Sequence, residues 1–113
     1  MQIERPRARR YPFVTSIEIT DMQSETQTKE QTKDLSLFGC HVNTLKPLAM
    51  GAKVRIRIAH KSTIFTALGR VANVQPNAHM GIVFTSIAPH DQQILEQWLA
   101  ELRDHREPPA KDL

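Results

Sequence analysis

The sequence predicts a mainly β domain, a small antiparallel barrel of six or seven strands with one C-terminal α-helix packed on it. Two patterns support this fold class. Short segments of alternating apolar and polar residues, separated by turn-forming residues, recur between Phe13 and Phe84. A single stretch with apolar residues three and four positions apart follows Pro89. A sheet of short strands buries its apolar face when it closes into a barrel, and an amphipathic helix buries its own apolar face by packing on that barrel.

The first half of the chain predicts three strands. Residues 13–20 alternate, and the side chains on one face are Phe13, Thr15, Ile17 and Ile19. The polar stretch 21–33 is expected to begin as an exposed connection and to end as an outer strand that leads into Asp34. After Gly39, the alternation of residues 40–43 indicates a short strand.

The second half predicts three more strands. Residues 53–58 alternate most regularly, with Val54, Ile56 and Ile58 facing inward. Residues 64–75 form another expected strand, in which Gly69 marks a bulge or a sharp bend. Residues 76–79 are typical of a turn, and residues 80–84 of a returning apolar strand.

The helix after Pro89 is amphipathic, with Asp91 near its positive N-terminal end. The residues on its apolar face are Ile94, Leu95, Trp98, Leu99 and Leu102. Trp98, the largest of them, is expected to be the main contact between helix and barrel.

A chain of 113 residues is long enough for one core. We expect an arginine-rich N-terminal arm at 1–12, the barrel with its helix at 13–103, and a disordered tail at 104–113. There is no apolar run of membrane-spanning length and no signal peptide pattern, so we expect a cytoplasmic protein without membrane insertion. The single cysteine, Cys40, cannot form an internal disulfide and is expected to be a buried structural thiol.

Enzymatic patterns are missing from the sequence. It has no glycine-rich phosphate loop, CxxC or HExxH pattern, and nothing supplies Ser36 with a base and an oxyanion hole. The histidines lack metal-ligand spacing; they are His41, His60, His79, His90 and His105. We therefore expect a protein that is not an enzyme and that has no metal and no cofactor.

The positive charge is concentrated at the start of the chain. Arg5, Arg7, Arg9 and Arg10 lie within the first ten residues, and the rest of the chain has equal numbers of basic and acidic residues. A compact arginine cluster suits a small anionic ligand or a local phosphate contact, whereas a long DNA duplex requires a broad basic face. The alternative is a solvated, disordered basic tail.

A second candidate site is the loop from Asp34 to Gly39. Asp34 and Ser36 are two residues apart in an extended segment, so both can project to one side and offer a carboxylate and a hydroxyl. Gly39 allows the backbone to turn or to approach a ligand closely. The alternative is that Asp34 and Ser36 only cap a turn before a strand.

These two segments together resemble the PilZ domain family, whose cyclic di-GMP-binding members carry an RxxxR motif followed by [D/N]xSxxG. Arg5 and Arg9 match the first motif, the Asp34 to Gly39 loop matches the second, and the resemblance extends over about residues 4–102. In many members the second arginine precedes an aromatic residue and the first strand, which here is the position of Arg10. We favour Arg5 with Arg9 and keep Arg10 as a candidate.

The resemblance implies a receptor for the bacterial second messenger cyclic di-GMP that signals to a separate protein partner. Arginine suits this ligand because its guanidinium pairs with phosphate or guanine and stacks on a purine. The implied ligand-binding residues are Arg5, Arg9, Arg10, Asp34, Ser36 and Gly39. We expect ligand binding to order the arm against the barrel.

Two other functions remain as alternatives. The first is a PilZ-like adaptor that binds a protein without nucleotide. The second is an OB-like barrel for single-stranded nucleic acid, which only 5% aromatic residues and a neutral body disfavour.

Overall fold

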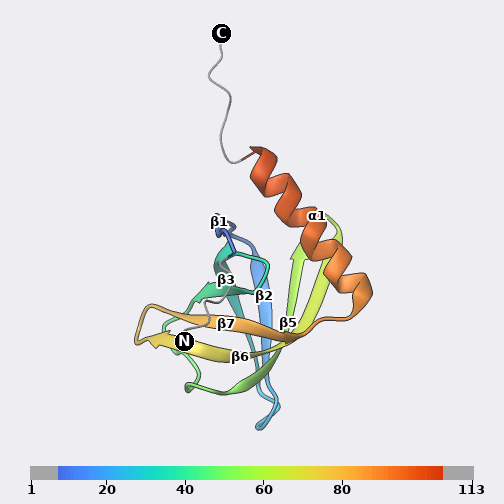
Figure 1. The fold of residues 1–113 in the computed structure, drawn as a ribbon. Helices are drawn as coiled ribbons and strands as arrows, with labels where there is room; N and C mark the ends of the chain where they lie inside the picture. Colours follow the sequence, from blue (N-terminus) through green and yellow to red (C-terminus); the bar gives the residue numbers. More distant parts are fainter. Residues whose placement is uncertain (1–7, 106–113) are drawn as a thin grey trace, which may run out of the picture.

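The computed structural model describes residues 8–105, which form seven strands and one helix (Figure 1). The elements are β1 (Tyr11–Pro12), β2 (Ser16–Asp21), β3 (Gln27–Leu35), β4 (Gly39–Asn43), β5 (Lys53–His60), β6 (Thr63–Gln75), β7 (His79–Ser86) and α1 (Pro89–His105). The mainly β class with one C-terminal helix is confirmed.

The strands form one antiparallel sheet that closes into a barrel. Six strands follow one another in the order β3, β2, β5, β6, β7 and β4, and the barrel closes because β4 pairs again with β3. Strand β1 is an extra strand that pairs with the end of β3, opposite Asp34 and Leu35. Closure leaves no free edge among the six barrel strands.

The alternating segments bury their apolar faces in the barrel as expected. Ile17, Val54, Ile56 and Ile58 are almost completely excluded from solvent. The other buried apolar residues of the strands include Ile19, Leu35, Val42, Phe65, Val71, Met80 and Ile82. Each of these side chains removes apolar surface from water, which is the main favourable contribution to the stability of the barrel.

Irregular pairing bends the sheet at three places. The register between β6 and β7 shifts at Gly69, which confirms the bulge expected there, and shifts again between Val71 and Asn73. A third irregularity lies in β3 between Thr32 and Asp34. Bulges increase the local twist, which helps a small sheet to close.

Helix α1 packs its apolar face over one end of the barrel (Figure 1). Trp98 is 4% exposed, and its ring lies 5.7 Å from that of Phe13 and 6.1 Å from that of Phe65. The expected role of Trp98 as the main helix contact is confirmed. His60 stacks edge-on against Trp98 at 5.4 Å, and burial, followed by the charge of Lys61, lowers the pKa of its imidazole.

The start of the first predicted strand was placed too early in the sequence. We expected it at 13–20, but β2 starts at Ser16. The hydroxyl of Thr32 donates to the Phe13 carbonyl and accepts from the Thr15 amide, so a side chain supplies part of the bonding before Ser16. Backbone bonds from Phe13 to Lys33 and from Thr32 to Thr15 supply the rest. Phe13 nevertheless faces the core, as predicted.

The division into arm, barrel and tail remains a prediction. Strand β1 lies within the range 1–12 expected for the arm, and α1 extends to His105. Residues 1–7 and 106–113 lie outside the described part of the chain. Within residues 8–105, no helix has both the length and the apolar character needed to cross a membrane.

The substitution Trp98→Ala should lower the free energy of unfolding by about 3 to 5 kcal/mol, because it leaves a cavity between α1 and the barrel. Urea titration followed by circular dichroism measures this loss. The matched control is Gln97→Ala, which alters an exposed position of the same helix. Equal stabilities of the two variants would contradict the role assigned to Trp98.

Candidate functional site

The turn between β3 and β4 is built around the side chain of Ser36. Its hydroxyl donates to the carbonyl of Gly39 at 3.1 Å and accepts from the amides of Phe38 and Gly39, both at 3.2 Å. One donor and two acceptor positions are all that a serine hydroxyl has. Ser36 therefore holds the shape of the loop, and a ligand could bond to its hydroxyl only by replacing one of these contacts.

Gly39 is required by the sheet itself. A β-carbon at this position would lie 2.2 Å from the carbonyl oxygen of Ile82 in β7. The loop is further fixed by the amide of Phe84, which donates to the carbonyl of Phe38 at 2.9 Å. The loop therefore lies directly against β7, and only glycine allows that approach.

Asp34 is held at the end of β3 by the strand beside it. The backbone amide of His41 donates to Asp34 Oδ1 at 3.0 Å, and Nδ1 of His41 lies 3.1 Å from Oδ2. The Asp34 side chain is 18% exposed. It is thus a carboxylate held in one orientation, with part of its surface still open to solvent.

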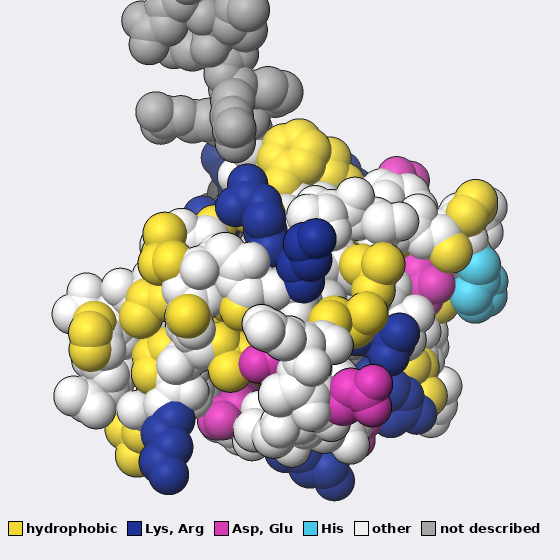
Figure 2. Space-filling view, turned by 90° about the horizontal axis from the view of Figure 1, so that it is seen from below, with side chains coloured by type: hydrophobic (Ala, Val, Ile, Leu, Met, Phe, Trp, Pro, Cys, Tyr) yellow, Lys and Arg dark blue, Asp and Glu magenta, His cyan; other side chains and the backbone are white. Residues whose placement is uncertain are grey.

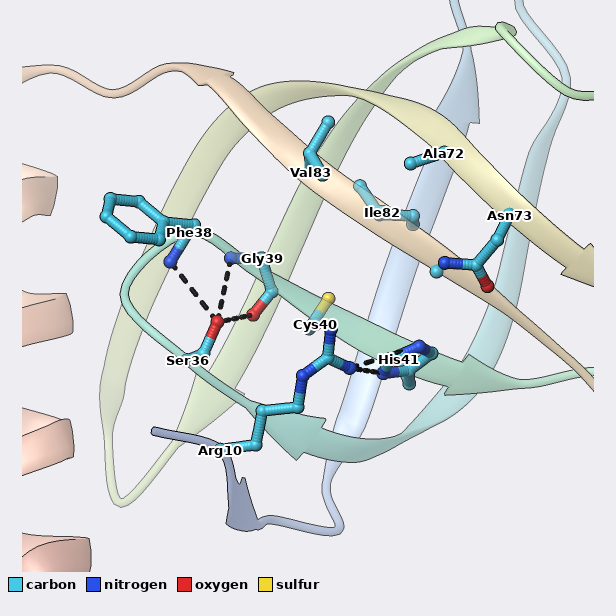
Figure 3. A pocket seen from close by; sticks show the side chains of 11 residues that line it. Arg10, Ser36, Phe38, Gly39, Cys40, His41, Ala72, Asn73, Ile82 and Val83 are labelled. Carbon is cyan, nitrogen blue, oxygen red and sulfur yellow. Dashed lines mark hydrogen bonds between the residues drawn. The ribbon is translucent and has the colours of Figure 1, made fainter. Parts of the chain in front are cut away.

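Arg10 extends from the N-terminal segment to the ring of His41 (Figure 3), and this places its guanidinium near the Asp34 carboxylate. Its Nη1 lies 3.7 Å from Asp34 Oδ2, and the guanidinium contacts the ring of His41. Arg10 from the segment before β1, Asp34 from β3 and His41 from β4 form what we call the Arg10 cluster. Asp34 and Arg10 come together as the sequence suggested, whereas His41 was not expected there.

Beside the Arg10 cluster is a shallow recess of about 70 Å³. Ser36, Phe38 and Gly39 line it from the loop, and β6 and β7 form its other wall (Figure 3). Gly81 of β7 shapes this wall, because a β-carbon there would lie 2.5 Å from the Asn73 side chain. The recess is much smaller than the roughly 300 Å³ or more typical of small-molecule pockets.

Arg9 lies in a different depression from Arg10. It lines a hollow of about 280 Å³ between the N-terminal segment, Leu37 of the loop, and the α1 residues Glu96, Leu99 and Arg103. The loop therefore contributes to both depressions, with Leu37 facing Arg9 and Ser36 facing Arg10. Arg5, the third arginine expected at the site, lies outside the described residues.

Cys40 is next to the site but takes no part in its surface chemistry. Its side chain is buried, and that burial, reinforced by the charge of Asp34, raises the pKa of the thiol to about 12. A thiol with such a pKa is a poor nucleophile at neutral pH. In the described part of the chain, no group of three or more histidine, cysteine or acidic side chains is arranged to hold a metal ion.

Three residues of the site were missed in the sequence. His41 follows Gly39 by two positions, so strand alternation alone could have placed it on the same face. Phe38 is 47% exposed. The sequence shows that an aromatic residue lies within the loop, and this was a signal that it could contact a ligand. Asn73 gave no such signal, because its place depends on how β6 pairs with β7.

Comparison with known proteins identifies one family. A family model described as the PilZ domain matches residues 4–101. No curated protein matches the chain in sequence.

Several solved structures share the fold at low sequence identity. The PilZ domain of YcgR from Escherichia coli, solved with cyclic di-GMP, is 16% identical with a TM-score of 0.74, and the match covers 91% of this chain and 95% of that one. The Bacillus subtilis inhibitor of motility (MotI/DgrA) is 19% identical with a TM-score of 0.72, and the match covers 93% of this chain and 54% of that one.

A third structure is the complex of MrkH from K. pneumonia with cyclic di-GMP. It is 19% identical with a TM-score of 0.73, and the match covers 92% of this chain and 55% of that one. The chain therefore spans about half of the length of MrkH and of the motility inhibitor. These likenesses establish the barrel fold.

The substitution Ser36→Ala should lower the free energy of unfolding by about 2 kcal/mol, because it leaves the buried amide of Gly39 without its side-chain acceptor. Chemical denaturation of the purified variant gives the value. Ser16→Ala, at an exposed position where β2 begins, is the matched control. If both variants were as stable as the wild type, Ser36 would not be organising the loop.

Proposed function

This chain belongs to the PilZ domain family, and on that premise we propose that it is a receptor for cyclic di-GMP that acts by binding and not by catalysis. The observation that carries the proposal is the Arg10 cluster, where a guanidinium and an oriented carboxylate lie side by side at the edge of the Ser36 loop. Two of the structural neighbours, the YcgR domain and MrkH, were solved with this ligand.

The chemistry of the Arg10 cluster suits each part of the ligand. Cyclic di-GMP is a ring with two phosphodiesters and two guanines. Arg10 can form paired hydrogen bonds with a phosphate or with the O6 and N7 atoms of guanine. Asp34 can accept hydrogen bonds from the guanine N–H groups. A carboxylate suits this role because both of its oxygens are acceptors, whereas arginine and lysine side chains have no acceptor.

The contacts within the Arg10 cluster present only a small barrier to ligand binding. Arg10 is 54% exposed, and its nitrogen is 3.7 Å from the Asp34 oxygen. This separation is too long for a hydrogen bond, and the exposed Arg10 side chain keeps much of its contact with water. A doubly charged ligand can therefore replace the contact between Arg10 and Asp34 with stronger, charge-assisted ones.

The recess cannot enclose a dinucleotide, so the ligand must lie across its rim. A volume of about 70 Å³ holds no more than a part of one guanine or a phosphate. Phe38, exposed on the loop, offers a flat ring on which a purine can stack. We propose that the N-terminal arm covers the ligand and that Arg5, within this arm, supplies a second guanidinium.

Within this proposal the six residues expected at the site have different roles. Arg5, Arg10 and Asp34 contact the ligand, while Ser36 and Gly39 shape the loop that positions Asp34 and Phe38. Arg9 faces the hollow beside α1. The motif pair that operates is then Arg5 with Arg10, and ordering of the arm provides the signal to a partner protein.

Isothermal titration calorimetry with cyclic di-GMP tests the proposal, with cyclic di-AMP and GTP as control ligands. Saturable heat is expected with cyclic di-GMP alone. Arg10→Ala and Asp34→Ala should each weaken binding about ten- to a hundredfold, since each removes charged hydrogen bonds worth about 1.5 to 3 kcal/mol. Arg10→Ala should retain the wild-type melting temperature to within a few degrees, whereas Asp34→Ala should stay folded with a lower melting temperature, because it also removes the acceptor of the His41 amide.

The matched control is Arg55→Ala, which removes an exposed arginine from the outer face of β5 and should bind like the wild type. Absence of heat from the folded wild-type protein at high micromolar cyclic di-GMP would overturn the proposal and favour the nucleotide-free adaptor. If Arg9→Ala lost binding while Arg10→Ala kept it, the receptor function would stand and the assignment of the arginines would be wrong.

A further inference from the structure

The outer face of the barrel carries a second depression. It is a groove of about 300 Å³ lined by Met22, Lys53, Val54, Leu68, Gly69, Arg70 and Thr85. These residues come from the turn after β2 and from β5, β6 and β7, so the groove runs across neighbouring strands. It shares no lining residue with the recess beside Arg10. We call it the β5–β6 groove.

Two basic side chains, Lys53 and Arg70, belong to the lining of the β5–β6 groove, and Arg55 lies on the same outer face of β5 as Lys53. Lys53, Arg55 and Arg70 are all exposed, and none of them forms an ion pair within residues 8–105. By contrast, Arg57 on the same face lies 3.5 Å from Glu18. The lining of the groove therefore carries two positive charges, on Lys53 and Arg70, that no described ion pair neutralises, and it contains no acidic side chain.

Two of these charges face each other directly. Lys53 in β5 pairs with Arg70 in β6 across the antiparallel ladder. Like charges at directly opposed positions destabilise a sheet. Such an arrangement becomes favourable when a negatively charged group lies between the two side chains.

The floor of the β5–β6 groove is apolar. Met22 is 38% exposed and Leu68 is 39% exposed, and both side chains line this one groove. Figure 2 views the barrel from the side of the turn after β2, and on this face hydrophobic side chains in yellow lie among basic ones in dark blue and acidic ones in magenta. An apolar centre with a charged rim is typical of a surface that binds another protein.

From these observations we propose that the β5–β6 groove binds an acidic segment of a partner protein. An apolar side chain of the segment enters the groove against Met22 and Leu68, and flanking carboxylates lie between Lys53 and Arg70. Strands β5 and β6 are both paired on each side, so the segment binds through its side chains and not by adding a strand.

Other anionic partners fit the β5–β6 groove less well. Its lining contains no aromatic residue on which a nucleic acid base could stack. A volume of about 300 Å³ equals that of roughly ten water molecules, which suits one or two side chains. A membrane surface would contact a protruding patch better than a concave groove.

The probe is a synthetic peptide of eight residues in which two leucines are flanked by glutamates, titrated into the full ¹⁵N-labelled chain. We expect saturable shifts of backbone amides confined to residues near 22, 53–55, 68–70 and 85. Replacing the leucines by serine, or the glutamates by glutamine, should weaken binding at least tenfold. Failure to saturate at several millimolar peptide, or shifts centred on other residues, would overturn the proposal.

The variant Lys53→Glu separates binding from folding. It places opposite charges at the paired positions, so the melting temperature should rise by about 2 °C while peptide binding falls at least tenfold. A matched charge change is Lys46→Glu, at an exposed loop position, which should leave peptide binding within twofold of the wild type. Equal losses in both variants would mean that the groove has no specific role.

Two further titrations distinguish a protein segment from other sources of negative charge. A uridine octanucleotide, or vesicles containing one third phosphatidylglycerol, should produce no saturable shifts at the groove. Stronger binding of either than of the peptide would overturn the choice of a protein segment. The proposal does not depend on the nucleotide, since Lys53→Glu should leave the calorimetric titration with cyclic di-GMP unchanged.

Discussion

The contact between the β3–β4 loop and strand β7 determines how this barrel closes. At Gly39 the two backbones come so close that no side chain fits between them, and β4 is thereby placed between β3 and β7. Ser36 holds the loop in the shape that makes this contact possible, with every hydrogen-bonding position of its hydroxyl in use. The same contact that completes the barrel therefore also determines where the loop lies.

The candidate ligand site follows from that closure. Because β4 pairs with β3, the backbone of His41 reaches Asp34 and holds its carboxylate toward Arg10. The interactions that build the loop are buried, whereas those made by Arg10 are half exposed and weak. This difference allows the arginine to exchange partners when a ligand arrives, while the carboxylate and the loop keep their positions.

The fold could be predicted from the sequence because most of its information is local. Alternation at 53–58 and the helical spacing around Trp98 determine which side chains face the core, and β5 and α1 are found there. The predicted start of β2 was too early, since the bonding between Phe13 and Thr15 is irregular and depends in part on the side chain of Thr32. A side-chain contact of this kind leaves no periodic signal in the sequence.

The site was predictable only in part for the same reason. The motif residues Asp34, Ser36 and Gly39 were found by their spacing, but only the structure separates an oriented carboxylate from a hydroxyl that is fully used within the loop. The neighbouring arginines, Arg9 and Arg10, cannot be distinguished in the sequence, yet they lie in different depressions. The β5–β6 groove also depends on strand pairing, which brings Lys53 opposite Arg70.

The central claim is that cyclic di-GMP binds at the Arg10 cluster. Nuclear magnetic resonance of the ¹⁵N-labelled chain, following the Nε–Hε signals of the arginines as the ligand is added, tests it most directly. Binding at the Arg10 cluster should shift and sharpen the Arg10 signal together with the amides of Asp34 and residues 38–41, while the Arg9 signal should change little. A shift confined to Arg9 and the α1 residues around it, or no shift at all, would contradict it.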